Sequence, residues 1–190
     1  MSLLYRFKPQ KDAHVKSIAI GLASIGITAN KITAFGLCLA LCAGFVAYSG
    51  FLYAALVLFS GSALCDALDG SVARASGEQT EFGLYFDGVA DRFSELFFVG
   101  GAVLGLNAPP SAFAVVGGAF LLLFARVYAH AQNCGAMATT FGRPERLLLL
   151  VAGLLCPPPF NAILFVAAAL GCVFSAVQIV ARTRRMDPAI

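Results

Sequence analysis

Charged residues are scarce in this chain. Asp, Glu, Lys and Arg make up 12% of its 190 residues, against roughly 25% in soluble domains. Hydrophobic residues account for 59%, and the mean hydropathy is +0.84. This composition excludes an ordinary soluble domain and predicts an integral membrane protein. The net charge of +3, with no basic stripe away from the membrane edges, also excludes nucleic-acid binding.

Cysteine pairs and a signal peptide are also missing. None of the six cysteines forms a CxxC pair, which excludes a zinc site and a disulfide framework. We interpret these cysteines as small buried apolar residues. The first 16 residues contain four basic residues and Asp12 but no compact apolar run followed by a cleavage site. No cleavable signal peptide is therefore predicted.

Long apolar segments dominate the rest of the chain. Residues 3–20 alternate basic and apolar positions, as a helix in the headgroup layer does. Because a span needs about 20 residues, the fifth of the segments that follow is short. We expect an all-α integral membrane protein, with an N-terminal interfacial amphipathic segment (1–20) and a membrane domain of six transmembrane helices (21–190). The six segments are Lys31–Tyr48, Phe51–Ala73, Phe82–Leu106, Ser111–Gln132, Pro144–Cys156 and Phe160–Ala181.

The connections between these segments alternate in charge. The connections at 49–50, 107–110 and 157–159 carry no charge, whereas those at 74–81 and 133–146 and both chain ends carry charged residues. The positive-inside rule therefore places both termini and the charged connections in the cytoplasm. We expect a bacterial inner (cell) membrane as the location. Gly101–Gly105 and the pair Gly117–Gly118 are expected to mark close helix packing.

Four aspartates interrupt the second and third segments. Asp66 and Asp69 share one helical face, as do Asp87 and Asp91. A carboxylate at the helix centre costs about 2.5–3.5 kcal/mol on insertion scales. With a rise of about 1.5 Å per residue, Asp69 and Asp87 lie at one depth and Asp66 and Asp91 one turn deeper. The four carboxylates are therefore expected to converge in the cytoplasmic half of the membrane.

Such a cluster repels itself unless hard cations neutralise it. Oxygen ligands suit Mg²⁺, Mn²⁺ or Ca²⁺, and Mg²⁺ is usually shared between carboxylates and substrate phosphates. Gly70 and Gly83 leave room for a ligand beside the acidic faces, and Arg74 can neutralise phosphate. Thr80 is the expected N-cap of the third segment. These residues predict a phosphate-bearing substrate.

The run D-x2-D-G-x2-A-R-x8-G-x3-D-x3-D resembles the signature of the CDP-alcohol phosphotransferase family. The run 29–33 (Ala-Asn-Lys-Ile-Thr) is similar to the family element P-N-x-[ILV]-T, with Ala29 in place of proline. The signature residues match at every position. They are Asp66, Asp69, Gly70, Ala73, Arg74, Gly83, Asp87 and Asp91.

The resemblance implies transfer of a phosphatidyl group from CDP-diacylglycerol to a small polar alcohol with release of CMP, with Mg²⁺ or Mn²⁺ as cofactor. It implies Asp66, Asp69 and Asp87 as metal ligands. Asp91 would be the general base, with a share in a second metal site. It also implies a homodimer. The residues expected at the CDP moiety are Asn30, Thr33, Asp66, Asp69, Gly70, Ala73, Arg74, Thr80 and Gly83.

The acceptor is less well marked. Arg126 and His130 lie four apart in the fourth segment, and Arg143 and Arg146 begin the fifth. All four are candidates for acceptor binding, with structural roles as the alternative for Arg126 and His130. The run Arg143–Leu147 resembles a segment of the inositol-phosphate-using branch. An inositol-type acceptor is favoured, and glycerol 3-phosphate and serine stay open.

Two other classes of membrane protein also use carboxylates within the bilayer. A divalent-cation transporter is one alternative, although its acidic residues would lie at the membrane midplane. An intramembrane prenyltransferase is the other, although its two Asp motifs are far apart in sequence. For Arg92 we expect an ion pair with Glu95, three residues on.

Overall fold

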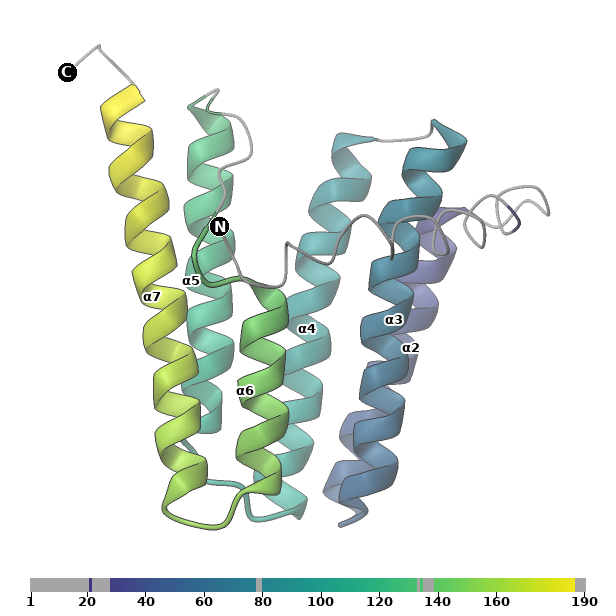
Figure 1. Ribbon diagram of the computed structural model, residues 1–190. Helices are drawn as coiled ribbons and strands as arrows, with labels where there is room; N and C mark the ends of the chain where they lie inside the picture. Colours follow the sequence, from purple (N-terminus) through teal and green to yellow (C-terminus); the bar gives the residue numbers. More distant parts are fainter. Residues whose placement is uncertain (1–20, 22–27, 78–79, 133, 135–138, 187–190) are drawn as a thin grey trace. The chain divides into compact units, whose positions relative to one another are not determined.

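The computed structural model describes residues 21, 28–77, 80–132, 134 and 139–186. Within these residues the chain forms six helices, which coincide with the six predicted apolar segments (Figure 1). The last helix continues past its predicted end at Ala181. The interfacial helix predicted for 1–20 lies outside the described residues. The helices are α2 (Ala29–Tyr48), α3 (Leu52–Ser76), α4 (Glu81–Gly105), α5 (Ala112–Ala131), α6 (Arg143–Leu155) and α7 (Phe160–Met186).

Four of these helices are long and apolar enough to cross a membrane, counted over the described part of the chain. They are α2, α3, α5 and α7. Helix α6 has 13 residues, which is shorter than the roughly 17–25 residues of a span. Helix α4 has 25 residues, so its length suffices, but Asp87, Asp91, Arg92 and Glu95 lower its mean hydropathy. The charged residues that mark a candidate site are therefore the same ones that lower the mean hydropathy of α4.

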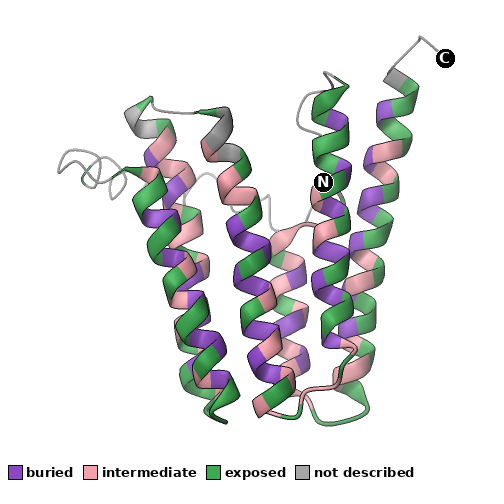
Figure 2. Cartoon of the chain, turned by 180° about the vertical axis from the view of Figure 1, so that it is seen from behind, coloured by how far each residue is buried: buried purple, intermediate pink, exposed green. Residues whose placement is uncertain are grey.

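The distribution of polar and apolar side chains is inverted relative to a soluble protein. Large apolar side chains such as Phe45, Tyr53 and Leu104 are exposed on the helix surfaces, and Asp69, Glu95 and other charged side chains are buried. Figure 2 shows exposed and buried positions alternating around each helix. Exposed apolar surface of this extent requires an apolar solvent. The chain is a membrane protein.

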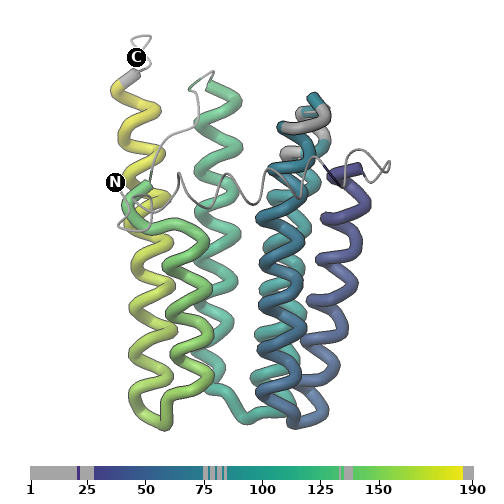
Figure 3. Tube along the Cα trace, turned by 45° about the vertical axis from the view of Figure 1, so that its right-hand side comes forward, coloured from purple at the N-terminus to yellow at the C-terminus, as the bar shows by residue number. Residues whose placement is uncertain are grey.

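The first three helices form one compact unit, within Leu4–Asn107, and run side by side in Figure 3. Helix α2 packs along both α3 and α4, which contact each other much less. Where α3 and α4 do meet, the rings of Phe59 and Phe98 stack with centroids 4.1 Å apart. Helix α2 is thus the common support of the two helices that carry the aspartates.

Glycines allow the backbones of α2 and α4 to touch. A Cβ atom at Gly101 would overlap the carbonyl oxygen of Gly44, and one at Gly105 would overlap that of Tyr48. The prediction of close packing at Gly101–Gly105 is confirmed. In the later pair, a Cβ at Gly118 would lie 2.8 Å from Cβ of Cys172, whereas Gly117 faces open space. Only Gly118 of that pair is a packing glycine.

The last three helices form a second unit, which includes Ala108–Ile190. Helix α7 packs against both α5 and α6. A buried cluster joins α5 to α7 through Leu122, Ala125, Ala129, Ala176 and Ile179. Before α6, the hydroxyl of Ser175 on α7 donates to the carbonyl of Phe141 (3.0 Å) and accepts from its N–H (3.1 Å). These contacts tie the start of α6 to α7.

The cysteine interpretation is partly wrong. All six cysteines lie in the described part of the chain and none is in a disulfide, but only Cys172 is buried. Cys38 and Cys42 are exposed. They lie four residues apart on the face of α2 that is turned away from its neighbours, where a thiol can face lipid as a small apolar group.

Candidate active site

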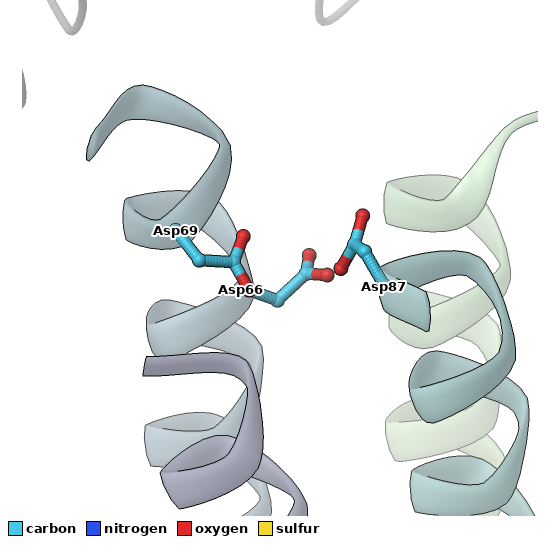
Figure 4. A group of neighbouring side chains, drawn as sticks. All are labelled: Asp66, Asp69 and Asp87. Atoms are coloured by element: carbon cyan, nitrogen blue, oxygen red, sulfur yellow. The ribbon is translucent and has the colours of Figure 1, made fainter. Parts of the chain in front are cut away.

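Three carboxylates meet between α3 and α4. Asp66, Asp69 and Asp87 each place one carboxylate oxygen within 4.8 Å of the others. Figure 4 shows the side chains of Asp66 and Asp69 extending from α3 toward Asp87 on α4. The helical spacing of i and i+3 puts the first two on one face, and the support of α2 brings the third opposite. The predicted convergence is confirmed for these three residues.

This group suits a hard divalent cation. All its donors are carboxylate oxygens, which is the chemistry that Mg²⁺ and Mn²⁺ prefer. Oδ1 of Asp87 is buried without a hydrogen-bond partner. A buried carboxylate oxygen without a partner is costly, and a cation among the three side chains would remove that cost. The residues therefore fit a metal ion.

Asp91 is buried outside this group of three. Its Oδ2 accepts a hydrogen bond from Arg92, the next residue in the chain, at 3.3 Å. The ion pair of Arg92 with Glu95 stays a prediction. The buried guanidinium turns back along α4, where it also donates to the carbonyl of Gly88 at 3.1 Å. Asp91 and the two aspartates of α3 line one recess, with room for about one water molecule.

Serines complete this recess. Ser62 of α3 and Ser94 of α4 line it and are both buried. The sequence prediction omitted them, although helical spacing was a usable signal. Ser62 precedes Asp66 by four residues and Ser94 follows Asp91 by three, so each shares a face with an aspartate.

Helix α2 contributes a polar contact to the group. The hydroxyl of Thr33 donates to Oδ2 of Asp69 at 2.6 Å, and both side chains are buried. The family resemblance placed Thr33 at the CDP moiety. The sequence gave no sign of this bond, because it joins residues 36 positions apart.

Residues predicted at the CDP moiety gather around Gly83. The hydroxyl of Thr80 caps α4 and accepts from the N–H of Gly83 at 3.0 Å, which confirms the predicted cap. A Cβ at Gly83 would lie 3.0 Å from Oγ1 of Thr80 and 3.6 Å from Oδ1 of Asn30. Asn30 and Thr80 therefore share the small space that the missing side chain leaves.

The other predicted CDP residues lie on α3. Arg74 is exposed near the end of the helix and donates to the hydroxyl of Ser71 at 3.0 Å. Its Nη1 would lie 3.5 Å from a Cβ at Gly70. Ala73 is partly buried. Gly70 thus leaves the space beside an accessible guanidinium open.

The predicted acceptor residues belong to the unit of α5–α7. Arg126 and His130 are exposed on α5. At the start of α6, Arg146 is completely buried and Arg143 is partly buried. The carboxylate of Glu145 accepts from the N–H of Gly142 at 3.0 Å and so caps this helix. A part for these four residues in acceptor binding stays a prediction.

Comparison with known proteins agrees with the signature. Residues 26–177 match the CDP-alcohol phosphatidyltransferase family. An archaetidylinositol phosphate synthase of Pyrococcus horikoshii is 30% identical over 163 residues, which cover 85% of each chain. The enzyme of the same description from Methanothermobacter thermautotrophicus is 29% identical over 184 residues, or 93% of this chain and 92% of that one.

Solved structures share the fold. A phosphatidylinositol phosphate synthase of Mycobacterium tuberculosis with CDP-DAG bound superimposes with a TM-score of 0.73 at 23% identity, covering 89% of this chain and 92% of that one. The same protein with manganese and citrate gives 0.69 at 24% identity, with coverage of 92% and 90%. By its family match and its relatives, this chain belongs to the CDP-alcohol phosphatidyltransferase family of phospholipid-synthesising membrane enzymes.

Proposed function

We propose that this enzyme transfers a phosphatidyl-type group from a CDP-linked lipid to an inositol phosphate and releases CMP. The observation that carries the reaction is the three-carboxylate group beside Asp91 in a chain of this family. Two relatives described as archaetidylinositol phosphate synthases support the acceptor, as does the resemblance of Arg143–Leu147 to the inositol-phosphate branch.

In the proposed reaction, Asp91 is the general base. The acceptor hydroxyl oxygen bonds to the β-phosphorus, the bond from that phosphorus to the bridging oxygen breaks, and CMP leaves with the bonding electrons. The hydroxyl proton passes to the carboxylate of Asp91. Arg92, 3.3 Å away, is positioned to keep that carboxylate oriented.

We assign Asp66, Asp69 and Asp87 as the ligands of Mg²⁺ or Mn²⁺. Such an ion supplies a positive charge that stabilises the phosphoryl oxygens as negative charge develops on them. A share of Asp91 in a second metal site is also part of the proposal.

The CDP moiety is proposed to bind beside these aspartates. Gly70 and Gly83 leave space for the CDP moiety to approach the helix backbone, and the guanidinium of Arg74 pairs with its phosphates. Asn30 and Thr80 at the space beside Gly83 are suited to hydrogen bonds with its polar groups. Ala73 contributes only a small side chain.

The acceptor phosphate is proposed to bind arginines of the second unit. Arg143 and Arg146 both lie in the first turn of α6, where a guanidinium can bind phosphate oxygens in a bidentate manner. Arg126 and His130 on α5 are the further candidates.

We further propose that all six helices are embedded in a bacterial inner membrane, with both termini and the active site facing the cytoplasm. The uncharged connections on one side and the charged ones on the other support this orientation. A homodimer, common in the family, is part of the proposal.

One assay tests the reaction and the acceptor together. Purified protein is incubated with Mg²⁺ or Mn²⁺, a CDP-linked lipid with acyl or ether chains, and one of four acceptors: inositol phosphate, inositol, glycerol 3-phosphate or serine. We expect CMP release with inositol phosphate and a product that carries a phosphorylated inositol headgroup. CMP release with another acceptor but not with inositol phosphate would refute the proposed acceptor. If no acceptor gives CMP release, the proposed reaction is refuted. Uptake of Mn²⁺ into proteoliposomes without CMP release would favour the cation-transporter alternative.

A further inference from the structure

Helix α2 carries no acidic residue, yet it packs against both helices that supply the aspartates. It contacts the acidic group through Thr33, whose Oγ1 lies 2.6 Å from Oδ2 of Asp69. Thr33 and Asp69 are 8% and 3% exposed, respectively. A hydrogen bond from a hydroxyl to a carboxylate is charge-assisted, and a length of about 2.5–2.7 Å is typical of the strong ones.

Thr33 has a second acceptor, the carbonyl of Ala29, at 3.1 Å. A hydroxyl has one proton, so the shorter contact to the carboxylate is the stronger of the two. Thr183 of α7 shows the alternative. It is also buried, and its hydroxyl donates to the carbonyl four residues earlier, that of Ile179, at 3.0 Å. Thr33 differs from Thr183 in reaching another helix.

The packing around Thr33 fixes its position. One turn deeper on α2, a Cβ at Gly36 would lie 3.0 Å from Cβ of Cys65, so α2 and α3 are in close contact there. Ile32, the residue before Thr33, packs in a buried cluster with Val72, which lies one turn after Asp69 on α3. A hydroxyl held between two such contacts orients the carboxylate that it bonds.

We propose that Thr33 is a positioning residue that orients Asp69 for metal binding, in place of the contact with CDP that its sequence motif implies. Its bond occupies one oxygen of Asp69, and the remaining lone pairs of that carboxylate are then directed to the cation shared with Asp66 and Asp87. The inference rests on the proposed metal-binding role of those aspartates.

Direct measurement of Mn²⁺ binding, without substrate, tests this proposal. Thr33→Val keeps the shape of the side chain and removes the hydroxyl. We expect its Kd for Mn²⁺ to rise about 10- to 100-fold, the range for loss of a partner that orients a metal ligand. Thr183→Val is the matched control, because it removes a buried hydroxyl whose bond stays within one helix, and it should bind Mn²⁺ as the unmodified protein does.

A second pair of variants guards against misfolding. Thr33→Ser and Thr33→Ala both lose the methyl group, and only the serine keeps the hydroxyl, so Thr33→Ser should retain Mn²⁺ affinity within about threefold and Thr33→Ala should lose it. At saturating Mn²⁺ the KM for the CDP-linked lipid should be unchanged in all of them. Unchanged Mn²⁺ affinity in Thr33→Ala and Thr33→Val would overturn the proposal, and a raised KM for the lipid in its place would assign Thr33 to the CDP site. Absence of transferase activity in the unmodified protein would refute the proposed function and leave the Mn²⁺ measurement valid.

Discussion

The two units of this chain bury different sets of charged side chains. The unit of α2–α4 buries three carboxylates and one guanidinium, and the unit of α5–α7 buries the guanidinium of Arg146. The buried charged residues of the first unit are Asp69, Asp91, Arg92 and Glu95. Carboxylates bind metal and accept protons, whereas arginines bind phosphate. Under the proposed function the two units divide the labour: the first would carry the reaction common to the family, and the second would select the acceptor.

The sharpest test of this division is the base. Asp91→Asn keeps the size of the side chain and removes its basicity, so we expect kcat to fall about 10²–10⁴-fold, the usual contribution of a general base. The loss should be equal for every acceptor. CMP release in steady state measures it. Full turnover in this variant would contradict the role given to Asp91.

The next test concerns the support of the first unit. In Gly101→Val the new side chain overlaps the backbone of Gly44, and overpacking of this kind costs about 1–3 kcal/mol or more. We expect a lower unfolding temperature in detergent and weaker Mn²⁺ binding. Gly117→Val is the control, because Gly117 faces open space. Equal unfolding temperatures in the two variants would show that the α2–α4 contact contributes little.

A change in the second unit should affect one substrate only. Arg143→Gln removes a charge at the start of α6, and loss of a charge-assisted hydrogen bond costs about 1.5–3 kcal/mol. We expect KM for inositol phosphate to rise about 10- to 100-fold, from the same figure, with KM for the CDP-linked lipid unchanged. If both KM values rise together, the units do not divide the substrates as proposed.

The smallest effect is expected at the connection before α6. Ser175→Ala leaves the N–H and carbonyl of Phe141 without their hydroxyl partner, which costs about 1–2 kcal/mol. Faster hydrogen exchange at Phe141 and a modest rise in KM for inositol phosphate should follow. Ser111→Ala is the matched control, because the hydroxyl of Ser111 is buried without a partner, so its removal should not lower stability. Equal exchange rates in the two variants would count against the tie between α6 and α7.

The sequence predicted the features that repeat with helical spacing. The six helices follow the apolar segments, the cap at Thr80 follows from its residue type, and Asp66 and Asp69 share a face because they are three residues apart. Contacts that depend on helix packing or on side-chain rotamers were not predictable. The bond from Thr33 to Asp69 depends on how α2 packs on α3, and the pairing of Arg92 with Asp91 depends on the rotamer of a long side chain. The outward direction of Cys38 and Cys42 likewise depends on which face of α2 its neighbours cover.

The charges of α4 also bear on how the protein enters the membrane during synthesis. Asp87, Asp91, Arg92 and Glu95 each oppose insertion, by about 2.5–3.5 kcal/mol for a charged residue at a helix centre. Helices α2 and α3 leave the ribosome first and are long and apolar enough to cross a membrane. Packing of α4 on α2 through Gly101 and Gly105 then shelters those charges. The helix that supports α4 is therefore made before the charges that it shelters.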